Sequence, residues 1–104
     1  MRPSRNDLLI RAFSGVLKAR RLELGLTQED LAGAIELDRP YITLIEAGRK
    51  QPSLSVAWRL AAGLKISMSE LAAQVDHQLA RLQAPTAQPR TAKKPPASKR
   101  TGSE

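Results

Sequence analysis

The 104-residue sequence contains no cysteine, one histidine and only three aromatic residues, and it has no apolar run long enough to span a membrane. Without cysteine, the chain forms no disulfide framework and no cysteine-based zinc site. The single histidine, His77, has no metal-ligand spacing around it, and there is no glycine-rich phosphate loop. We therefore expect no metal, no cofactor and no enzymatic activity. The amino terminus lacks the apolar stretch of a signal peptide, which predicts a soluble, cytoplasmic protein.

Acidic residues are fewer than basic residues, and the excess of basic residues is unevenly distributed along the chain. The net charge is +7, from 17 basic and 10 acidic residues. Residues 84–104 contain five basic and one acidic residue, whereas residues 1–83 contain twelve and nine. A basic balance favours polyanionic partners, either nucleic acid or an anionic membrane surface. In residues 1–83 a binding surface must therefore come from the placement of charges and not from their total.

The spacing of apolar residues and helix-capping signals predicts five short helices. They are expected over residues 7 to about 23, 28–35, 39–47, 54 or 56 to about 64, and 68 to about 83. Gly25 and Gly48 suit the left-handed position that follows many helices. The expected amino-terminal caps, in chain order, are Ser4 or Asn6, Thr27, Asp38, Ser53 or Ser55, and Ser67.

The two ends of the chain differ from the helical part. Residues 84–104 contain four prolines and no valine, isoleucine, leucine, phenylalanine or tryptophan. Such a segment cannot bury enough apolar surface to offset its ordering entropy, so we expect a disordered basic tail. The tail would either add non-specific DNA affinity through counterion release or serve as a solubilising extension. Residues 1–6 are expected to be a flexible arm, which leaves a domain over residues 7–83.

The second and third predicted helices, joined by a short turn, have the pattern of a helix-turn-helix over residues 28–47. Ile42 and Ile45 are three residues apart and turn one face of the third helix inward. The residues left nearer the outside are Arg39, Pro40, Thr43, Leu44 and Ala47. The third helix is therefore the candidate reading element.

Three blocks of the sequence resemble the Cro/phage-repressor family, the XRE-type helix-turn-helix regulators. They are LKARRLELGLTQEDLA (17–32), YITLIEAGRKQPSL (41–54) and LAAGLKISMSEL (60–71), and the resemblance covers residues 8–74. It implies an all-α, five-helix lambda-repressor-like DNA-binding domain. Glu36 stands where the family usually has glycine, which predicts a positive φ with a small local strain. Pro40 removes a polar side chain from a position that often contacts DNA.

The resemblance implies a set of contacts to the DNA backbone. Thr27 and Gln28 would meet a phosphate at the start of the second helix, where free N–H groups attract an anion. Arg49 and Lys50 would lie along the sugar-phosphate backbone, and Tyr41 would donate to a phosphate. The alternatives are that Thr27 only caps its helix, that Gln28 is only solvated, that Tyr41 packs against the second helix, and that the loop with Arg49 is only solvated.

Base contacts are expected from the outer face of the third helix, at Arg39, Pro40, Thr43 and Leu44. Arg39 can pair bidentately with guanine O6 and N7, and Thr43 and Leu44 can touch a thymine methyl group, whereas Pro40 offers no donor. The alternative for Arg39 is a salt bridge to Glu36 or Asp38.

Two further expectations concern structure and assembly. The resemblance places Arg21 and Glu46 as a buried ion pair between the first helix and the end of the third. In the last helix, Val75, Leu79 and Leu82 continue a heptad pattern, and a monomer is expected to leave them exposed. They are therefore predicted to form a homodimer interface. The alternatives are that this helix frays after Ala73 or folds back on the first helix.

These observations predict a sequence-specific transcriptional regulator, expected to be a repressor, that binds double-stranded DNA as a homodimer and is associated with the nucleoid. One alternative is the antitoxin of a toxin–antitoxin pair, in which the tail binds a toxin. Another is a protein-interaction module that keeps the fold without binding DNA.

Overall fold

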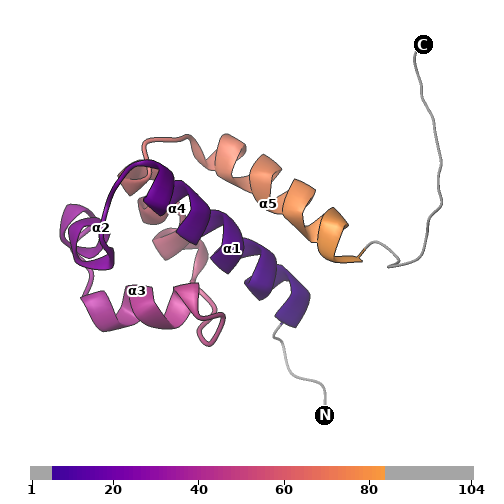
Figure 1. Ribbon diagram of the computed structural model, residues 1–104, viewed down its shortest axis with the longest axis horizontal. Helices are drawn as coiled ribbons and strands as arrows, with labels where there is room; N and C mark the ends of the chain where they lie inside the picture. The colour runs from indigo at the N-terminus through magenta and orange to yellow at the C-terminus, as the bar shows by residue number, and fades with distance from the viewer. Residues whose placement is uncertain (1–5, 84–104) are drawn as a thin grey trace.

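The computed structural model describes residues 6–83, which form five α-helices and no strand (Figure 1). The helices are α1 Asp7–Glu23, α2 Gln28–Ala34, α3 Arg39–Glu46, α4 Leu54–Gly63 and α5 Met68–Gln83. This architecture confirms the all-α fold class. The expected disordered tail and nearly all of the expected arm lie outside the described residues. No helix in the described range is long and apolar enough to cross a membrane.

The helices begin at short polar side chains that accept hydrogen bonds from free backbone N–H groups. Asn6 accepts from the Leu9 N–H at 3.0 Å and so caps α1. In α2 the capping is reciprocal, because Thr27 accepts from the Asp30 N–H at 2.9 Å while Asp30 accepts from the Thr27 N–H at 3.0 Å. For α4 the cap is Ser53, which accepts from the Val56 N–H at 3.1 Å.

The start of α3 differs from this pattern. Asp38 occupies the cap position, but its side chain makes no capping hydrogen bond, so the expectation of a side-chain cap is wrong. Pro40 has no N–H to offer, and the Tyr41 N–H donates instead to the Asp38 carbonyl at 3.1 Å. The first turn of α3 is therefore bonded through the backbone alone.

The first four helices end alike, with the residue after the C-cap in the left-handed region. At Gly25 and Gly48 φ is +74° and +73°, which glycine adopts without strain. Glu36 has φ of +59°, as its departure from the family pattern predicts. Lys65, at +63°, is a second non-glycine example that the sequence did not indicate.

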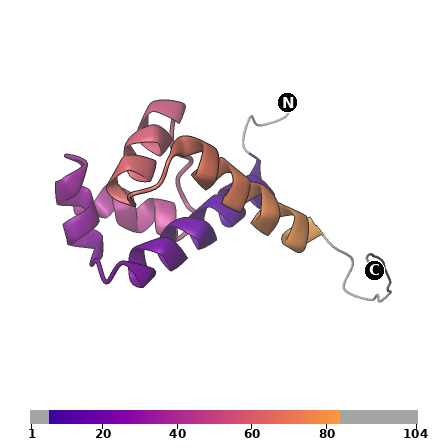
Figure 2. The same cartoon turned by 90° about the horizontal axis from the view of Figure 1, so that it is seen from above.

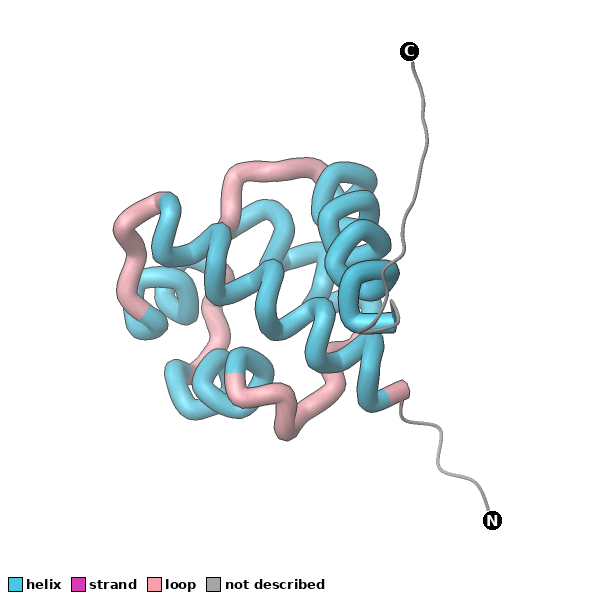
Figure 3. The backbone as a smooth tube through the Cα atoms, turned by 45° about the vertical axis from the view of Figure 1, so that its right-hand side comes forward, coloured by secondary structure: helices cyan, strands magenta, loops and turns pink. Residues whose placement is uncertain are grey.

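The core is built around α1, which packs most extensively on α5 and also touches α3. Figures 2 and 3 show α5 lying alongside α1 while α2 and α3 stand at the other end of the molecule. The carboxyl end of α4 lies close to the carboxyl end of α2. A Cβ atom added at Gly63 would come within 2.6 Å of Ile35 Cγ2, so only glycine fits there without a shift of its neighbour. The largest fully buried side chains are Leu17, Leu31, Ile42, Ile45, Leu60, Leu64 and Leu71.

The fold corrects the expectation that a single chain leaves the apolar side of α5 exposed. Val75 is buried, and Leu79 and Leu82 are partly buried and pack against the core. The reason is that α5 folds back along α1, which was the alternative considered for this helix. On α4, Trp58 is 57% exposed.

Candidate nucleic-acid interface

Helix α3 presents one apolar face to the core and one mixed face to solvent. Ile42 and Ile45 are 0% and 1% exposed, which anchors the inner face. The five residues expected on the outer face are all exposed, namely Arg39, Pro40, Thr43, Leu44 and Ala47. Because α3 has eight residues, its axis is about 12 Å long, a length that fits within a DNA major groove of about 12 Å width.

Arg39 is the first residue of α3, and its side chain is exposed. Within residues 6–83 it forms no salt bridge with Glu36 or Asp38, so the alternative considered for this arginine is not observed. The positive amino-terminal end of α3 lies beside it, and Pro40 follows. A guanidinium at this exposed corner is well placed to meet an anionic or hydrogen-bond-accepting partner.

A buried ion pair joins α1 to the end of α3. Arg21 Nε donates to Glu46 Oε2 at 2.5 Å, and a second guanidinium nitrogen donates to Glu46 Oε1 at 3.0 Å. The third arginine nitrogen donates to the Leu26 carbonyl at 2.6 Å. The two side chains are 8% and 4% exposed. The hydrogen bond to Glu46 raises the pKa of Arg21 above its ordinary value, although burial acts in the opposite direction.

Gln28 and Thr43 extend this pair toward the outer face of α3. Gln28 Nε2 donates to Glu46 Oε1 at 3.0 Å, and the Thr43 hydroxyl donates to Gln28 Oε1 at 2.6 Å. The Thr43 oxygen also lies 3.1 Å from the Arg39 carbonyl. The expected phosphate contact Gln28 and the expected base contact Thr43 are therefore in direct contact with each other.

The loop after α3 brings a lysine over an aromatic ring. Lys50 Nζ lies 5.3 Å from the centroid of the Tyr41 ring, within range of a cation–π interaction. Tyr41 itself is half-buried and packs against the core. The Arg49 N–H donates to the Leu44 carbonyl at 2.9 Å, which ties this loop to the last turn of α3. Arg49 and Lys50 are both exposed.

The start of α2 combines free N–H groups with acidic side chains. Thr27 is exposed, and Glu29 and Asp30 lie in the first turn. The Asp30 carboxylate accepts from the Thr27 N–H, and this backbone hydrogen bond, with that from the Thr27 side chain, lowers its pKa. The two carboxylates reduce the attraction of this helix end for a phosphate, and the Thr27 N–H is already bonded to Asp30.

Sequence reasoning missed the role of two arginines. Arg59 donates to the Ile35 carbonyl and, at 3.3 Å, to the Glu36 carbonyl, so it holds the turn between α2 and α3. Arg20 Nε donates to the Leu64 carbonyl at 2.9 Å, at the end of α4. Both bonds join residues more than 20 positions apart, and nothing in the local sequence distinguishes these arginines from solvated ones. Part of the basic excess of the domain is thus used inside the fold.

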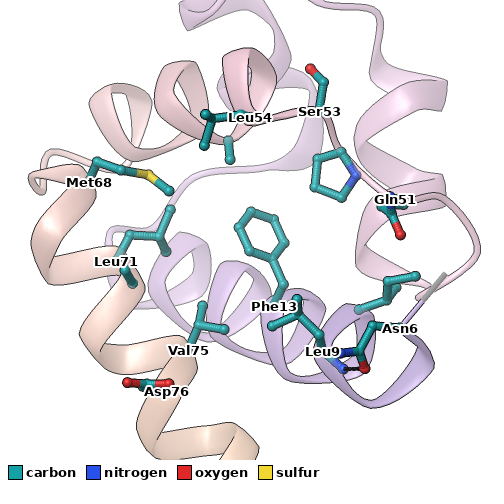
Figure 4. Close-up of a pocket in the computed structure, with 14 residues that line it drawn as sticks. Asn6, Leu9, Phe13, Gln51, Ser53, Leu54, Met68, Leu71, Val75 and Asp76 are labelled. Carbon is teal, nitrogen blue, oxygen red and sulfur yellow. Dashed lines mark hydrogen bonds between the residues drawn. The ribbon is translucent and has the colours of Figure 1, made fainter. Parts of the chain in front are cut away.

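An open apolar groove of about 500 Å³ lies between α1, α4, α5 and the loop before α4 (Figure 4). Phe13 and Val75 are buried in its lining. Leu9 and Leu54 also line it and are 41% and 67% exposed. None of the outer-face residues of α3 lines this groove, so it is an exposed apolar surface separate from them.

The fold and this interface define a helix-turn-helix DNA-binding domain, with α2 and α3 as its two characteristic helices. A family model described as Helix-turn-helix matches residues 17–71, more than half of the chain. The chain belongs to this XRE-type helix-turn-helix family of transcriptional regulators.

Similar proteins support this assignment. The control protein C.MunI of Mycoplasma sp. is 37% identical over 73 residues, which cover 70% of this chain and 99% of that protein. The restriction-modification controller protein C.Esp1396I, solved as a tetramer with its natural 35-base-pair operator, is 34% identical with a TM-score of 0.65 and covers 68% of this chain and 93% of its own. The controller protein C.AhdI of Aeromonas hydrophila is 37% identical with a TM-score of 0.58, over 60% of this chain and 94% of its own.

Proposed function

We propose that this protein is a sequence-specific regulator that binds a pseudo-palindromic operator as a homodimer and represses transcription from it. The observation that carries the proposal is the exposed outer face of α3, supported from beneath by the Arg21–Glu46 pair. Two such helices would enter successive major grooves about 34 Å apart. The proposed site of action is the DNA of the cytoplasmic nucleoid.

The proposed base contacts come from the exposed residues of α3. Arg39 would pair with guanine O6 and N7, a contact that discriminates by about 1–3 kcal/mol against other bases. Thr43 and Leu44 would face the next bases, with Leu44 giving apolar contact to a thymine methyl group. Pro40 lies beside them and supplies only its ring.

The proposed phosphate contacts surround that face. Lys50 and Tyr41 would act together, because the Lys50 ammonium group lies over the Tyr41 ring. The ammonium group and the Tyr41 hydroxyl would both contact the phosphate backbone. Arg49 follows α3 in the same loop. At the other side, the Thr27 N–H already donates to Asp30, so Thr27 would contribute its hydroxyl group. Gln28 would offer its backbone N–H and the one amide hydrogen beyond that given to Glu46.

The proposed homodimer uses the apolar groove and not an exposed heptad surface on α5. Leu54 and Leu9 are the exposed leucines of the groove, and Val75 lies buried in its lining. Pairing two copies here would bury leucines that a monomer leaves in water. The similarity to a controller protein solved as a tetramer on its operator supports assembly on DNA.

The similarity to restriction-modification controller proteins favours the genes of a restriction-modification system as the regulated targets. Binding upstream of such genes, beside the coding sequence of this protein, would support this assignment. The antitoxin alternative stays a prediction, because the tail on which it depends lies outside the described residues.

The decisive experiment is selection of bound sequences from random DNA duplexes at about 0.1 M salt, followed by binding measurements with the variant Arg39→Ala. We expect two half-sites in inverted orientation, one helical turn apart or a multiple of it. Arg39→Ala should lose its preference at one base pair of each half-site, by roughly five- to a hundredfold.

The matched control is Arg81→Ala, which removes an equal charge from an exposed arginine near the far end of α5. It should weaken binding to all sequences equally or leave it unchanged. No enrichment of any sequence by the unmodified protein would refute the proposed function.

A further inference from the structure

A chain of hydrogen bonds runs from the buried ion pair to the surface of α3. Glu46 Oε1 accepts from Arg21 at 3.0 Å and from Gln28 Nε2 at 3.0 Å. Gln28 Oε1 then accepts from the Thr43 hydroxyl at 2.6 Å. Glu46 is almost fully buried, Gln28 is half-buried and Thr43 is exposed. The chain therefore connects a fixed interior charge to one residue of the proposed reading face.

Chemistry decides the direction of every bond in this chain. The Glu46 carboxylate, paired with Arg21, only accepts hydrogen bonds, so the Gln28 atom that faces it must be the amide nitrogen. The amide oxygen of Gln28 must then face Thr43. An amide oxygen only accepts, so the Thr43 hydroxyl must be the donor.

The direction matters because a hydroxyl group has one proton and two lone pairs. The two acceptors near the Thr43 oxygen are Gln28 Oε1 at 2.6 Å and the Arg39 carbonyl at 3.1 Å. Both belong to the protein, and the shorter bond is the one to Gln28. The proton is thus committed within the protein, and only lone pairs and the methyl group of Thr43 remain for a partner.

We propose that Thr43 determines specificity as a hydrogen-bond acceptor, and that Gln28 is the positioning residue that holds it in this role. The inference rests on the proposed function, in which the outer face of α3 meets base edges. In the major groove, the donors are the amino groups of adenine N6 and cytosine N4. Guanine O6 and N7 and thymine O4 are acceptors, so they would place lone pairs against the lone pairs of Thr43. The preferred base opposite Thr43 is therefore adenine or cytosine.

This role of Gln28 differs from a phosphate contact in a measurable way. A phosphate contact contributes to binding of every sequence alike. A positioning role changes the preference at only one base pair, and only through Thr43. Gln28 can make a phosphate contact and position Thr43 at the same time, because its second amide hydrogen is not used by Glu46. Overall affinity therefore does not separate the two roles, and the base preference does.

The test compares selected base profiles and affinities for the full chain and for Thr43→Val, Thr43→Ser, Gln28→Met and the double variant of Thr43→Val with Gln28→Met. The base pair that Thr43 meets is the one whose profile changes in Thr43→Val, which keeps the shape but loses the acceptor. There, the unmodified protein should prefer one base pair, whose adenine or cytosine amino group would face Thr43, by about fivefold, the value of one hydrogen bond. Thr43→Ser should keep this preference, and Thr43→Val should lose it.

Gln28→Met should weaken the same preference by about twofold or more, since the hydroxyl keeps only the longer bond to Arg39. In the Thr43→Val background, Gln28→Met should change no base preference. The preference that Arg39 gives elsewhere in the half-site should stay unchanged throughout. Thermal unfolding of each variant shows whether it is folded, and the Thr43→Val and Thr43→Ser pair still tests the acceptor role if Gln28→Met unfolds.

Three results would overturn the inference while leaving the proposed function intact. They are an unchanged base profile in folded Thr43→Val, loss of the preference in Thr43→Ser, and an unchanged preference in folded Gln28→Met. If the unmodified protein enriches no sequence at all, the proposed function fails and this inference fails with it.

Discussion

Replacing Arg21 with methionine is expected to destabilise the domain severely. Arg21→Met keeps most of the apolar stem but removes three hydrogen bonds, two to Glu46 and one to the Leu26 carbonyl. Glu46 is 4% exposed and would keep only the bond from Gln28. An unpaired buried carboxylate of this kind costs about 3–5 kcal/mol.

The expected loss is large compared with the stability of so small a domain. A folded region of about 80 residues has a free energy of unfolding of roughly 4–12 kcal/mol. Each kcal/mol corresponds to about 4–8 °C in Tm at this size, so we expect Arg21→Met to lower Tm by at least about 12 °C. Urea unfolding followed by circular dichroism is the suitable assay, because Trp58 is 57% exposed and its fluorescence would report unfolding poorly.

Two comparisons isolate the ion pair from the loss of side-chain packing. The double variant Arg21→Met with Glu46→Leu removes both charges and should recover at least half of the loss, since apolar pairs of similar volume often replace buried ion pairs without cost. Arg81→Met, at an exposed arginine, should change the unfolding free energy by less than about 0.5 kcal/mol. A loss below about 1 kcal/mol in Arg21→Met, or a double variant as unstable as the single one, would refute this reasoning.

Three further predictions follow from individual contacts. Glu36→Gly should raise the free energy of unfolding by about 0.5–1 kcal/mol in urea titrations, because φ is +59° and glycine adopts it without strain; a lower stability would contradict this. The hydrogen bonds from Thr27 lower the pKa of Asp30 below its ordinary value of 3.8. The stability that the Asp30 carboxylate contributes is therefore complete above pH 3.8 and is lost as the pH falls through the lower folded pKa. The difference in unfolding free energy between the unmodified protein and Asp30→Asn should shrink between about pH 5 and pH 2 and stay constant above about pH 5. Leu54→Glu should leave the monomer folded, since Leu54 is 67% exposed at the start of α4 where an acidic residue is favourable, but should prevent dimerisation in analytical ultracentrifugation; an unchanged dimer would exclude the groove as the interface.

The local features of the fold were predictable from the sequence because their causes lie within a few residues. The reciprocal bonds of Thr27 and Asp30 span three positions, whereas the left-handed turn at Glu36 was expected only through the family resemblance. The outer face of α3 was predictable too, since the spacing of Ile42 and Ile45 fixes which residues face away from the core. Asp38 is the instructive exception: a good capping residue makes no capping bond, and the Tyr41 N–H, at the position that donates to the caps of α1, α2 and α4, donates to the Asp38 carbonyl.

The partners of long polar side chains were not predictable in this way. Gln28 reaches Thr43 and Glu46, which are 15 and 18 positions away, and Arg20 reaches the Leu64 carbonyl 44 positions away. Periodicity assigns such residues to a surface, and only the packing of helices decides which acceptor comes within reach. The Arg21–Glu46 pair, 25 positions apart, was anticipated only through the family resemblance.

The sequence by itself thus determined that five helices form, the bounds of each to within two residues, and which side of α3 faces solvent, because backbone hydrogen bonding and apolar spacing act over one or two helical turns. The tertiary structure alone decided that α5 folds back along α1 and covers Val75. It also decided that Arg59 and Arg20 donate hydrogen bonds to backbone carbonyls and that the Thr43 hydroxyl donates to Gln28. These outcomes depend on how whole helices pack, since hydrogen bonds and burial between distant residues exist only once the helices have met.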